Sequence, residues 1–117
     1  EVMANADLGV VPKRNDSFGG EAFSTKILEF MALGVPVVVS RTKVDDYYFN
    51  DSVVQFFQPE NERDLANCLL RMARDKVLRD RFATNASDFV VNYSWDRNKG
   101  EYLSLVDGLL GRSACRP

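Results

Sequence analysis

The stretch FGGEAFSTKILEFMALGVPVVVS, residues 18–40, decides the fold because a glycine-ended loop, a helix and a buried strand follow one another in it. A helix that begins near Ser24 is expected to end at Gly34, since a glycine followed closely by Pro36 is a typical helix stop. The run PVVVS at 36–40 is apolar on both faces, which is typical of a strand covered by helices on both sides. The stretch therefore predicts part of an α/β protein.

Two further apolar runs predict strands on either side of this stretch. LGVVP precedes it and SVVQFFQP follows it, so we expect strands at about 8–12, 36–40 and 53–57. Apolar residues then recur every three or four positions, which predicts flanking helices and a helical C-terminus. This alternation favours parallel strands with right-handed crossovers, and three strands suggest the second half of a doubly wound, Rossmann-like α/β domain. The helical stripes comprise Leu65, Cys68, Leu69 and Met72; Leu78, Phe82, Ala86, Phe89 and Tyr93; and, after Ser94 as N-cap, Tyr102, Val106 and Leu109.

The composition excludes several classes of protein. The chain has 117 residues, of which 45% are hydrophobic and 27% charged, so it forms at most one domain with a buried core. A net charge of −2 argues against a nucleic-acid-binding domain, and we expect no nucleic acid partner. The absence of histidine excludes a Ser-His-Asp triad and histidine-based zinc sites. Of the two cysteines, Cys68 is expected in the core and Cys115 in the tail.

The chain begins with Glu1 in a segment, EVMANA, that has the pattern of a helix end, which suggests a piece of a longer protein. No signal peptide and no long apolar run is visible in the sequence. We therefore expect a cytoplasmic protein, with peripheral attachment to a membrane as an open alternative.

Ligands of doubly wound domains bind beyond the carboxyl ends of the strands, where the loop 13–21 and the helix start at 22–26 are expected to lie. Gly19 and Gly20 allow a tight turn and a close approach of the backbone to a ligand. The helix behind them offers free N–H groups and the positive end of its dipole to an anion. The alternative is that the glycine pair is only a turn and that Ser24 is only a helix cap.

Glu21 and Glu29 are the candidate ligand-binding carboxylates. A carboxylate accepts hydrogen bonds from two neighbouring hydroxyls and therefore suits a sugar or a ribose. One glutamate before the helix and another inside it would contact two different rings of one ligand. The alternative is that Glu21 only favours the helix start and that Glu29 is an ordinary solvated helix residue.

The segment EAFSTKILEFMALGVPVVVS resembles the E-x7-E signature of the retaining nucleotide-sugar glycosyltransferases of the GT-B fold, glycosyltransferase family 4 (group 1). Members commonly read E-G-F-G-x-x-x-x-E-A-M-A-x-G-x-P-V-V, and TKILEFMA is still more similar to the K-L-x-E-Y-M-A of the branch that acts on surface polysaccharides. The end of the chain, YSWDRNKGEYLSLV, resembles the F-S-W closing helix of the family. The matching positions are Glu21, Phe23, Glu29, Met31, Ala32, Gly34, Pro36, Val37 and Val38.

The resemblance implies that residues 1–117 are part of a C-terminal nucleotide-sugar-binding domain, without the first half of that domain and without the N-terminal acceptor domain. It implies a hexosyltransferase-type enzyme that moves a sugar from a nucleotide sugar to an acceptor hydroxyl with retention, in polysaccharide or glycoconjugate synthesis. The family's diphosphate-neutralising Arg/Lys pair would lie in the absent half, so the chain alone is expected to be inactive. Its expected partners are a nucleotide sugar and the missing N-terminal domain of the same protein.

Carried over residue by residue, the resemblance makes Glu21 the catalytic-site contact to the donor sugar and Glu29 the contact to the ribose hydroxyls. The remaining donor-binding residues would face the diphosphate through the helix start and the backbone around it. Ala22 stands where the family usually has glycine, which leaves the identity of the donor open. These donor-binding residues are Gly20, Phe23, Ser24, Thr25 and Lys26, with Ser24 also at a position where glycine is usual.

With this resemblance, neither a metal nor a cofactor is expected, because the helix dipole and basic side chains would neutralise the diphosphate. Asp45 and Asp46 are adjacent and followed by aromatic residues, and we interpret them as a solvated turn rather than a D-x-D metal site. Two other functions remain open: a nucleotide-sugar epimerase of the same fold, and a non-catalytic α/β interaction module.

The strand at 8–12 would pair, in the parent fold, with a strand of the absent half. Alone it is an apolar and uncharged sheet edge, which proteins normally cover. We therefore expect self-association through this edge, although Lys13 and Arg14 just beyond the strand would discourage pairing.

Overall fold

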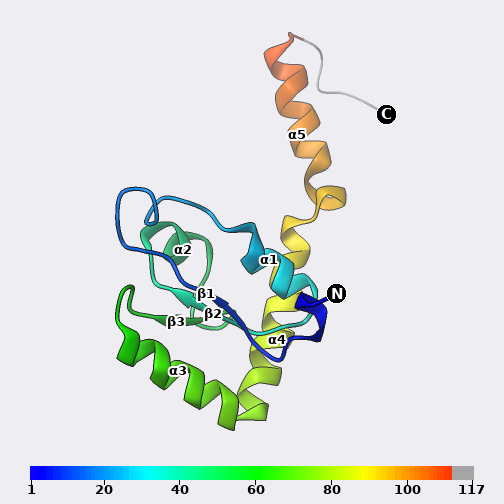
Figure 1. Cartoon of the computed structure of the whole chain (residues 1–117). Helices are drawn as coiled ribbons and strands as arrows, with labels where there is room; N and C mark the ends of the chain where they lie inside the picture. The colour runs from blue at the N-terminus through cyan, green and yellow to red at the C-terminus, as the bar shows by residue number, and fades with distance from the viewer. Residues whose placement is uncertain (112–117) are drawn as a thin grey trace.

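The computed structural model describes residues 1–111, which form a small parallel sheet with helices on both faces (Figure 1). The helix end expected at residues 1–6 is a single 3₁₀ turn, and Cys115 of the predicted tail lies outside the described residues. The elements, in chain order, are η1 (Met3–Asn5), β1 (Gly9–Val11), α1 (Thr25–Ala32), β2 (Val37–Ser40), α2 (Lys43–Tyr48), β3 (Gln55–Phe57), α3 (Glu62–Arg74), α4 (Lys76–Val90), η2 (Val91–Tyr93) and α5 (Trp95–Leu109).

The strands are parallel and lie in the order β1-β2-β3. In register, Val10 lies opposite Val38, and Val38 lies opposite Gln55. This arrangement confirms the predicted α/β fold with three parallel strands and a helical C-terminus. The strands are shorter than the apolar runs that predicted them. Val53 is buried but belongs to a turn, in which its N–H donates to Asn50 O at 3.1 Å.

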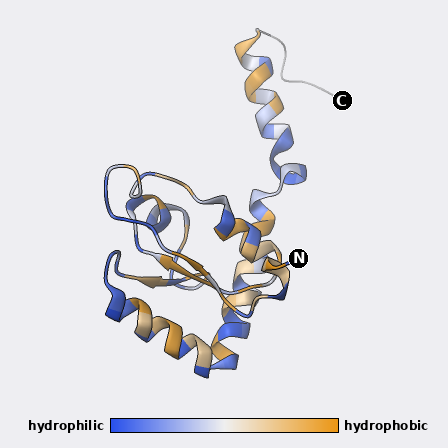
Figure 2. Ribbon diagram, viewed as in Figure 1, coloured by the Kyte–Doolittle hydropathy of each residue, from blue (hydrophilic) through white to orange (hydrophobic). Residues whose placement is uncertain are grey.

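The middle strand β2 carries the core on both of its faces. Val37 and Val39 pack into the cluster beneath α1 and α4, whereas Val38 packs into the cluster beneath α3. Every residue of β2 is buried, as its continuous apolar run predicts. Figure 2 shows hydrophobic residues concentrated in the strands and along α3. Cys68 in α3 is buried, which confirms its predicted core position.

Local signals set the ends of the helices. Gly34 has a φ of +74° just after α1, a left-handed conformation that favours glycine, so the predicted helix stop is confirmed. Thr42, Asn61 and Ser94 cap α2, α3 and α5, each through a side-chain oxygen that accepts a backbone N–H of the helix. Ser94 therefore starts the last helix, as the sequence predicts.

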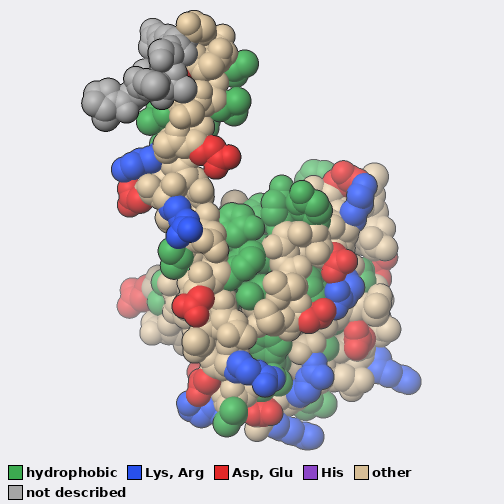
Figure 3. Space-filling model, turned by 180° about the vertical axis from the view of Figure 1, so that it is seen from behind, with side chains coloured by type: hydrophobic (Ala, Val, Ile, Leu, Met, Phe, Trp, Pro, Cys, Tyr) green, Lys and Arg blue, Asp and Glu red, His purple; other side chains and the backbone are tan. Residues whose placement is uncertain are grey.

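The last helix, α5, projects away from the rest of the protein (Figure 1). Its predicted apolar stripe is not buried, since Tyr102 is 55% exposed and Leu109 is 80% exposed. Figure 3 shows hydrophobic side chains on the surface of this helix. Within residues 1–111, no helix has both the length and the apolarity required to cross a bilayer.

Candidate functional site

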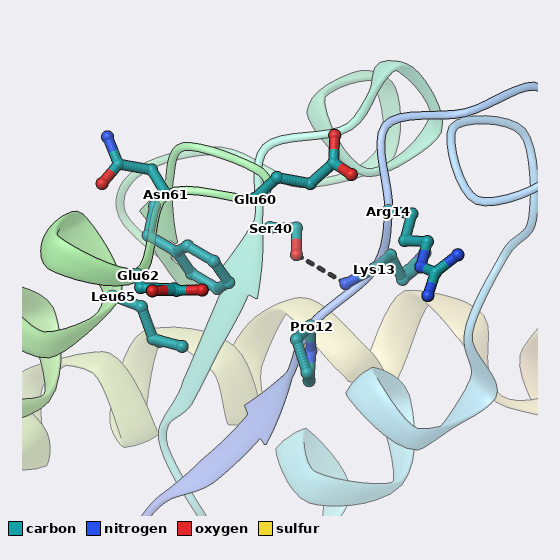
Figure 4. A pocket seen from close by; sticks show the side chains of 9 residues that line it. Pro12, Lys13, Arg14, Ser40, Glu60, Asn61, Glu62 and Leu65 are labelled. Carbon is teal, nitrogen blue, oxygen red and sulfur yellow. Dashed lines mark hydrogen bonds between the residues drawn. The ribbon is translucent and has the colours of Figure 1, made fainter.

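The loop between β1 and α1 lies at the carboxyl ends of the strands, where α/β domains bind ligands. At this edge the Lys13 N–H donates to the hydroxyl of Ser40, the last residue of β2, at 2.7 Å. Figure 4 shows the pocket that opens there, at the carboxyl ends of all three strands. The pocket has a volume of about 240 Å³ and is lined by Pro12, Lys13, Arg14, Ser40, Phe57, Glu60, Asn61, Glu62 and Leu65.

Gly19 and Gly20 are required by the packing of the loop on itself. A Cβ atom on Gly19 would lie closer to Arg14 O than the 3.0 Å that real Cβ atoms keep, and one on Gly20 would lie 2.9 Å from Asp16 O. The Gly19 N–H donates to Asp16 Oδ1 at 2.6 Å, and the Gly20 N–H donates to Asp16 O at 2.9 Å. The structure therefore supports the turn interpretation of the glycine pair, and the role of Gly20 toward a ligand stays a prediction.

Glu21 follows these glycines and exposes its carboxylate. Its side chain is 67% exposed, and Oε1 lies 3.4 Å from Lys43 Nζ on α2. An ion pair between two exposed side chains is weak, because solvent screens both charges. Glu21 and Lys43 share a pocket of about 310 Å³ whose wall includes Tyr47 and Tyr48. The carboxylate is therefore available to accept hydrogen bonds from a ligand.

The start of α1 presents positive charge without a side-chain cap. Ser24 occupies the N-cap position, but its side chain accepts no hydrogen bond from the helix. The first turn contains no acidic residue, and it contains Lys26, whose side chain is exposed. The N–H groups of the first turn and the helix dipole therefore favour an anion at this point, and Ser24 and Thr25 add hydroxyl groups.

Glu29 lies one turn further along α1 and is exposed. It lines a second pocket, of about 510 Å³, between α1 and the end of α4 with the segment that follows it, together with Tyr93 and Ser94. The structure therefore places Glu21 and Glu29 in separate hollows rather than in one shared pocket. The exposure of Glu29 agrees both with a ligand-binding residue and with a solvated helix residue.

Phe23 packs its ring against the end of α2. The ring makes an edge-to-face contact with Tyr48, with centroids 5.1 Å apart, and stacks on Phe49 at 6.0 Å. Aromatic contacts of this kind join the loop to α2. The side chain of Phe23 thus has a structural role, and its backbone remains the predicted phosphate contact.

A buried ion pair that was not predicted from the sequence lies beneath the loop. Asp45 Oδ2 is 2.7 Å from Lys13 Nζ, and the Asp45 side chain is 0% exposed. Lys13 Nζ also donates to Ala22 O at 2.7 Å. The prediction of a solvated turn at Asp45 and Asp46 is therefore wrong for Asp45, which is buried in the first turn of α2 because Lys13 neutralises its charge.

The sequence does carry a signal for this pair. Lys13 comes just after a buried strand, and Asp45 lies in the first turn of the helix that follows the next parallel strand. The carboxyl ends of parallel strands meet at one edge of the sheet, so an acidic and a basic residue in these positions are brought close together.

Asp46, in contrast, is exposed and pairs with Arg41 at 2.6 Å. Burial by itself would lower the pKa of Arg41, but hydrogen bonds and Coulombic attraction to Asp51 and Asp46 outweigh burial and raise this pKa. The Arg41 guanidinium also lies 4.2 Å from the centre of the Phe56 ring. Among residues 1–111, no three His, Cys, Asp or Glu side chains gather as a metal site would require.

Parallel strands with a glycine-ended loop and an uncapped helix start at their carboxyl edge define a Rossmann-like α/β protein. Comparison with known proteins identifies the family within this class. The family model "Glycosyl transferases group 1" matches residues 1–89, a span that contains every predicted site residue. A phosphatidyl-myo-inositol mannosyltransferase of Mycobacterium leprae (strain TN) is 32% identical over 94 residues, which cover 80% of this chain and 24% of that protein. The chain belongs to the glycosyl transferases group 1 family.

Further relatives agree with this family. A phosphatidyl-myo-inositol mannosyltransferase of Mycobacterium tuberculosis (strain ATCC 25618 / H37Rv) is 26% identical over 117 residues, 96% of this chain and 30% of that protein. The chain therefore spans less than a third of the length of these curated relatives.

Solved structures confirm the fold as part of a GT-B fold. Sucrose-phosphate synthase from Thermosynechococcus elongatus has a TM-score of 0.82 at 21% identity, over 96% of this chain and 27% of that one. A glycosyltransferase from Rickettsia africae ESF-5 has a TM-score of 0.74 at 17% identity, over 96% of this chain and 30% of that one. The roles predicted for the site residues stay predictions, because these likenesses show the fold alone.

Proposed function

We propose that this chain is the donor-binding part of a retaining glycosyltransferase that transfers a sugar from a nucleotide sugar to an acceptor hydroxyl. The observation that carries the proposal is the family match over residues 1–89, which contains the whole loop and helix start at the carboxyl edge of the sheet. Membership of the family supports sugar transfer, and we propose a nucleotide-sugar donor and retention of the anomeric configuration.

In this proposal the nucleotide sugar lies along α1. Its diphosphate faces the start of the helix, where Thr25 and Lys26 add a hydroxyl and a positive charge to the free N–H groups. Glu29, about 6 Å further along the helix axis than Thr25, accepts hydrogen bonds from the ribose. Glu21 accepts hydrogen bonds from the transferred sugar. One extended ligand would occupy both pockets, which explains why the two carboxylates line separate pockets.

The step that this site assists is the departure of the nucleoside diphosphate. As the bond between the sugar and the diphosphate breaks, negative charge grows on the phosphate oxygens. Preorganised N–H dipoles of α1 and the Lys26 ammonium stabilise this charge. The proposal includes no metal and no cofactor, since the helix start and basic side chains supply the positive charge.

The names of the relatives suggest which sugar and acceptor to test first. The mycobacterial relatives are named phosphatidyl-myo-inositol mannosyltransferases, so phosphatidyl-myo-inositol is the first acceptor to test. We therefore propose a hexosyl donor, with mannose as the first candidate, and a role in glycoconjugate or polysaccharide synthesis. An acceptor in a phospholipid would place the protein in the cytoplasm at the membrane surface.

The proposal also includes a longer protein. An N-terminal acceptor domain and the first half of the donor domain would complete the site, and the short span of the chain relative to its relatives supports this. The purified 117-residue chain should accordingly transfer no sugar. Turnover of any nucleotide sugar by that chain would show that the proposed domain boundaries are wrong.

The proposal is tested by assaying the full-length protein with GDP-mannose, UDP-glucose and UDP-N-acetylglucosamine, each with and without excess EDTA. We expect one donor to be consumed equally well in EDTA, with the anomeric configuration of the product retained by NMR. An epimerised nucleotide sugar as product would support the epimerase alternative, and no binding of any donor would support the non-catalytic module.

A pair of matched variants tests the role of Glu21. Glu21→Gln should lower kcat by about 100-fold or more, the scale of losing one preorganised contact to the reacting group. Glu101→Gln changes an exposed glutamate on α5, away from the site, and should leave kcat unchanged. Equal kcat values for the two variants would remove Glu21 from the proposed site.

A further inference from the structure

We propose that Lys13 is a positioning residue of the donor site, which holds Glu21 in place through the carbonyl of Ala22. The inference rests on the proposed donor-binding function. Lys13 Nζ donates to Ala22 O at 2.7 Å and pairs with Asp45 Oδ2 at 2.7 Å. The Lys13 side chain is only 11% exposed, so these two contacts occupy an ammonium group that solvent barely reaches.

The backbone is held on both sides of Glu21. On one side, the Val44 N–H of α2 donates to Gly20 O at 3.2 Å. On the other side, Lys13 Nζ donates to Ala22 O. The Glu21 side chain makes an exposed contact of 3.4 Å with Lys43, which is too weak to fix it. The Glu21 and Ala22 N–H groups donate only within the loop, to Phe18 O, so the two neighbouring carbonyls carry the hydrogen bonds that connect this segment to Lys13 and to α2.

Lys13 and Asp45 are themselves fixed to regular elements. The Lys13 N–H donates to the hydroxyl of Ser40, which is fully buried at the end of β2. Asp45 Oδ2 accepts from Thr42 Oγ1, the N-cap residue of α2, at 2.8 Å. Lys13 therefore fixes the backbone beside Glu21 relative to β2 and α2. A carboxylate that must meet a sugar needs support of this kind to hold a productive geometry.

The stability of the fold alone does not explain why charged residues occupy positions 13 and 45. Burying two charges costs desolvation, and apolar residues of similar volume often replace such pairs without loss of stability. Asp45 Oδ1 is buried and has no hydrogen-bond partner within residues 1–111, so Lys13 and Thr42 support the carboxylate through Oδ2 alone. An apolar pair would not supply a donor for the Ala22 carbonyl beside Glu21. That donor is the role that we assign to Lys13.

The variants separate the contact with Ala22 from the burial of charge. Lys13→Met alone leaves the Asp45 charge buried without its partner and should destabilise the fold. Lys13→Met combined with Asp45→Asn removes both charges and the donor to Ala22 while nearly preserving volume, so this double variant should fold. Lys13→Arg keeps both donor functions and is the rescue variant. Asp46→Asn changes the exposed neighbouring carboxylate and is the matched control.

The first measurement is amide hydrogen exchange of the full-length protein without ligand. The Glu21 and Ala22 N–H groups both donate to Phe18 O, so their exchange rates measure how often these hydrogen bonds of the loop open. In the double variant both should exchange about tenfold faster or more, because local opening becomes easier. Lys13→Arg and Asp46→Asn should retain the exchange rates of the unaltered protein.

The second measurement is steady-state transfer by the same full-length variants, with GDP-mannose as donor. The double variant should lower kcat by about tenfold or more, because small displacements of a contacting group are costly to the reaction. The affinity for GDP alone, which does not reach Glu21, should change by less than about threefold. In a Glu21→Gln background the double substitution should cause no further loss of kcat, since Lys13 acts through Glu21.

Unchanged exchange at Glu21 and Ala22 in the folded double variant would overturn the inference, whatever the activity. An unchanged kcat, or an equal loss in the Glu21→Gln background, would also overturn it, because Lys13 would then act independently of Glu21. If the unaltered protein transfers no sugar from any of the donors, the proposed function fails instead. The exchange measurement then still decides whether Lys13 holds the loop.

Discussion

Replacing Gly19 with alanine should open the loop that carries Glu21. The added Cβ would lie closer to Arg14 O than the 3.0 Å that real Cβ atoms keep, and 3.0 Å from the Arg14 carbonyl carbon. Both are backbone atoms, so no rotation of a side chain relieves the clash and the chain itself must shift. This shift would break the hydrogen bond from the Gly19 N–H to Asp16 Oδ1.

The expected loss of stability combines two effects. A hydrogen bond contributes about 0.5–1.5 kcal/mol net to folding, and overpacking a close-packed position costs about 1–3 kcal/mol. Residues 15–18 on the outer side of the loop are exposed and can relax, so part of the strain will be relieved. We therefore expect the free energy of unfolding to fall by about 1–3 kcal/mol rather than by the full sum.

Urea unfolding followed by circular dichroism measures this loss. Gly100→Ala is the matched control, because nothing lies within 4 Å of its Cβ position in α5. In an exposed helix interior, alanine is favoured over glycine by about 1 kcal/mol, so this control should not lose stability. If Gly19→Ala unfolds within about 0.5 kcal/mol of the unaltered protein, the range of a harmless surface change, the close packing inferred for the loop is refuted.

Three further predictions concern the ribose contact, the sheet edge and the buried thiol. In the full-length protein, Glu29→Ala should weaken donor binding by about 1.5–3 kcal/mol in a titration, the range for a hydrogen bond to a charged group. An unchanged affinity would exclude contact between Glu29 and the ribose, and a large loss of thermal stability would favour a structural role for Glu29. The purified chain should self-associate at micromolar concentration through the sheet edge β1, where Val10 is 38% exposed, and light scattering measures this. Val10→Lys should reduce the self-association, and a sharply folding monomer would contradict the prediction. Burial is the main cause that raises the pKa of the Cys68 thiol above its ordinary value of 9.0, and the negative charge of Asp64 adds to this effect. The unfolded chain therefore loses its thiol proton at a lower pH than the folded protein, so stability should fall as the pH rises above 9.0. In a Cys115→Ser background, Cys68 should react with iodoacetamide more slowly in the native chain than in urea, and equal rates would argue against its burial.

Local signals in the sequence were sufficient to predict most elements of the fold. The continuous apolar run of β2 required burial on both faces, and Gly34 supplied the left-handed residue that ends α1. Ser94 marked the start of α5 through a single side-chain hydrogen bond. Such signals act over a few residues, because backbone sterics and capping are local. The start of β3 was less well determined, since Val53 is buried in a turn and gives the same apolar pattern as a strand.

Tertiary structure alone decided how the candidate site is arranged. The sequence pointed to Glu21 and Glu29, but only the packing of α2 against the loop and of α4 against α1 placed them in separate hollows. Lys13 lies in the loop after β1 and Asp45 in the first turn of α2, and the parallel pairing of β1 with β2 brings the two together. A charged residue can be buried only if a partner reaches it, and periodicity does not encode a partner distant in the chain. The exposed stripe of α5 has the same cause, because spacing predicts an apolar helix face and only the surrounding structure decides what covers it.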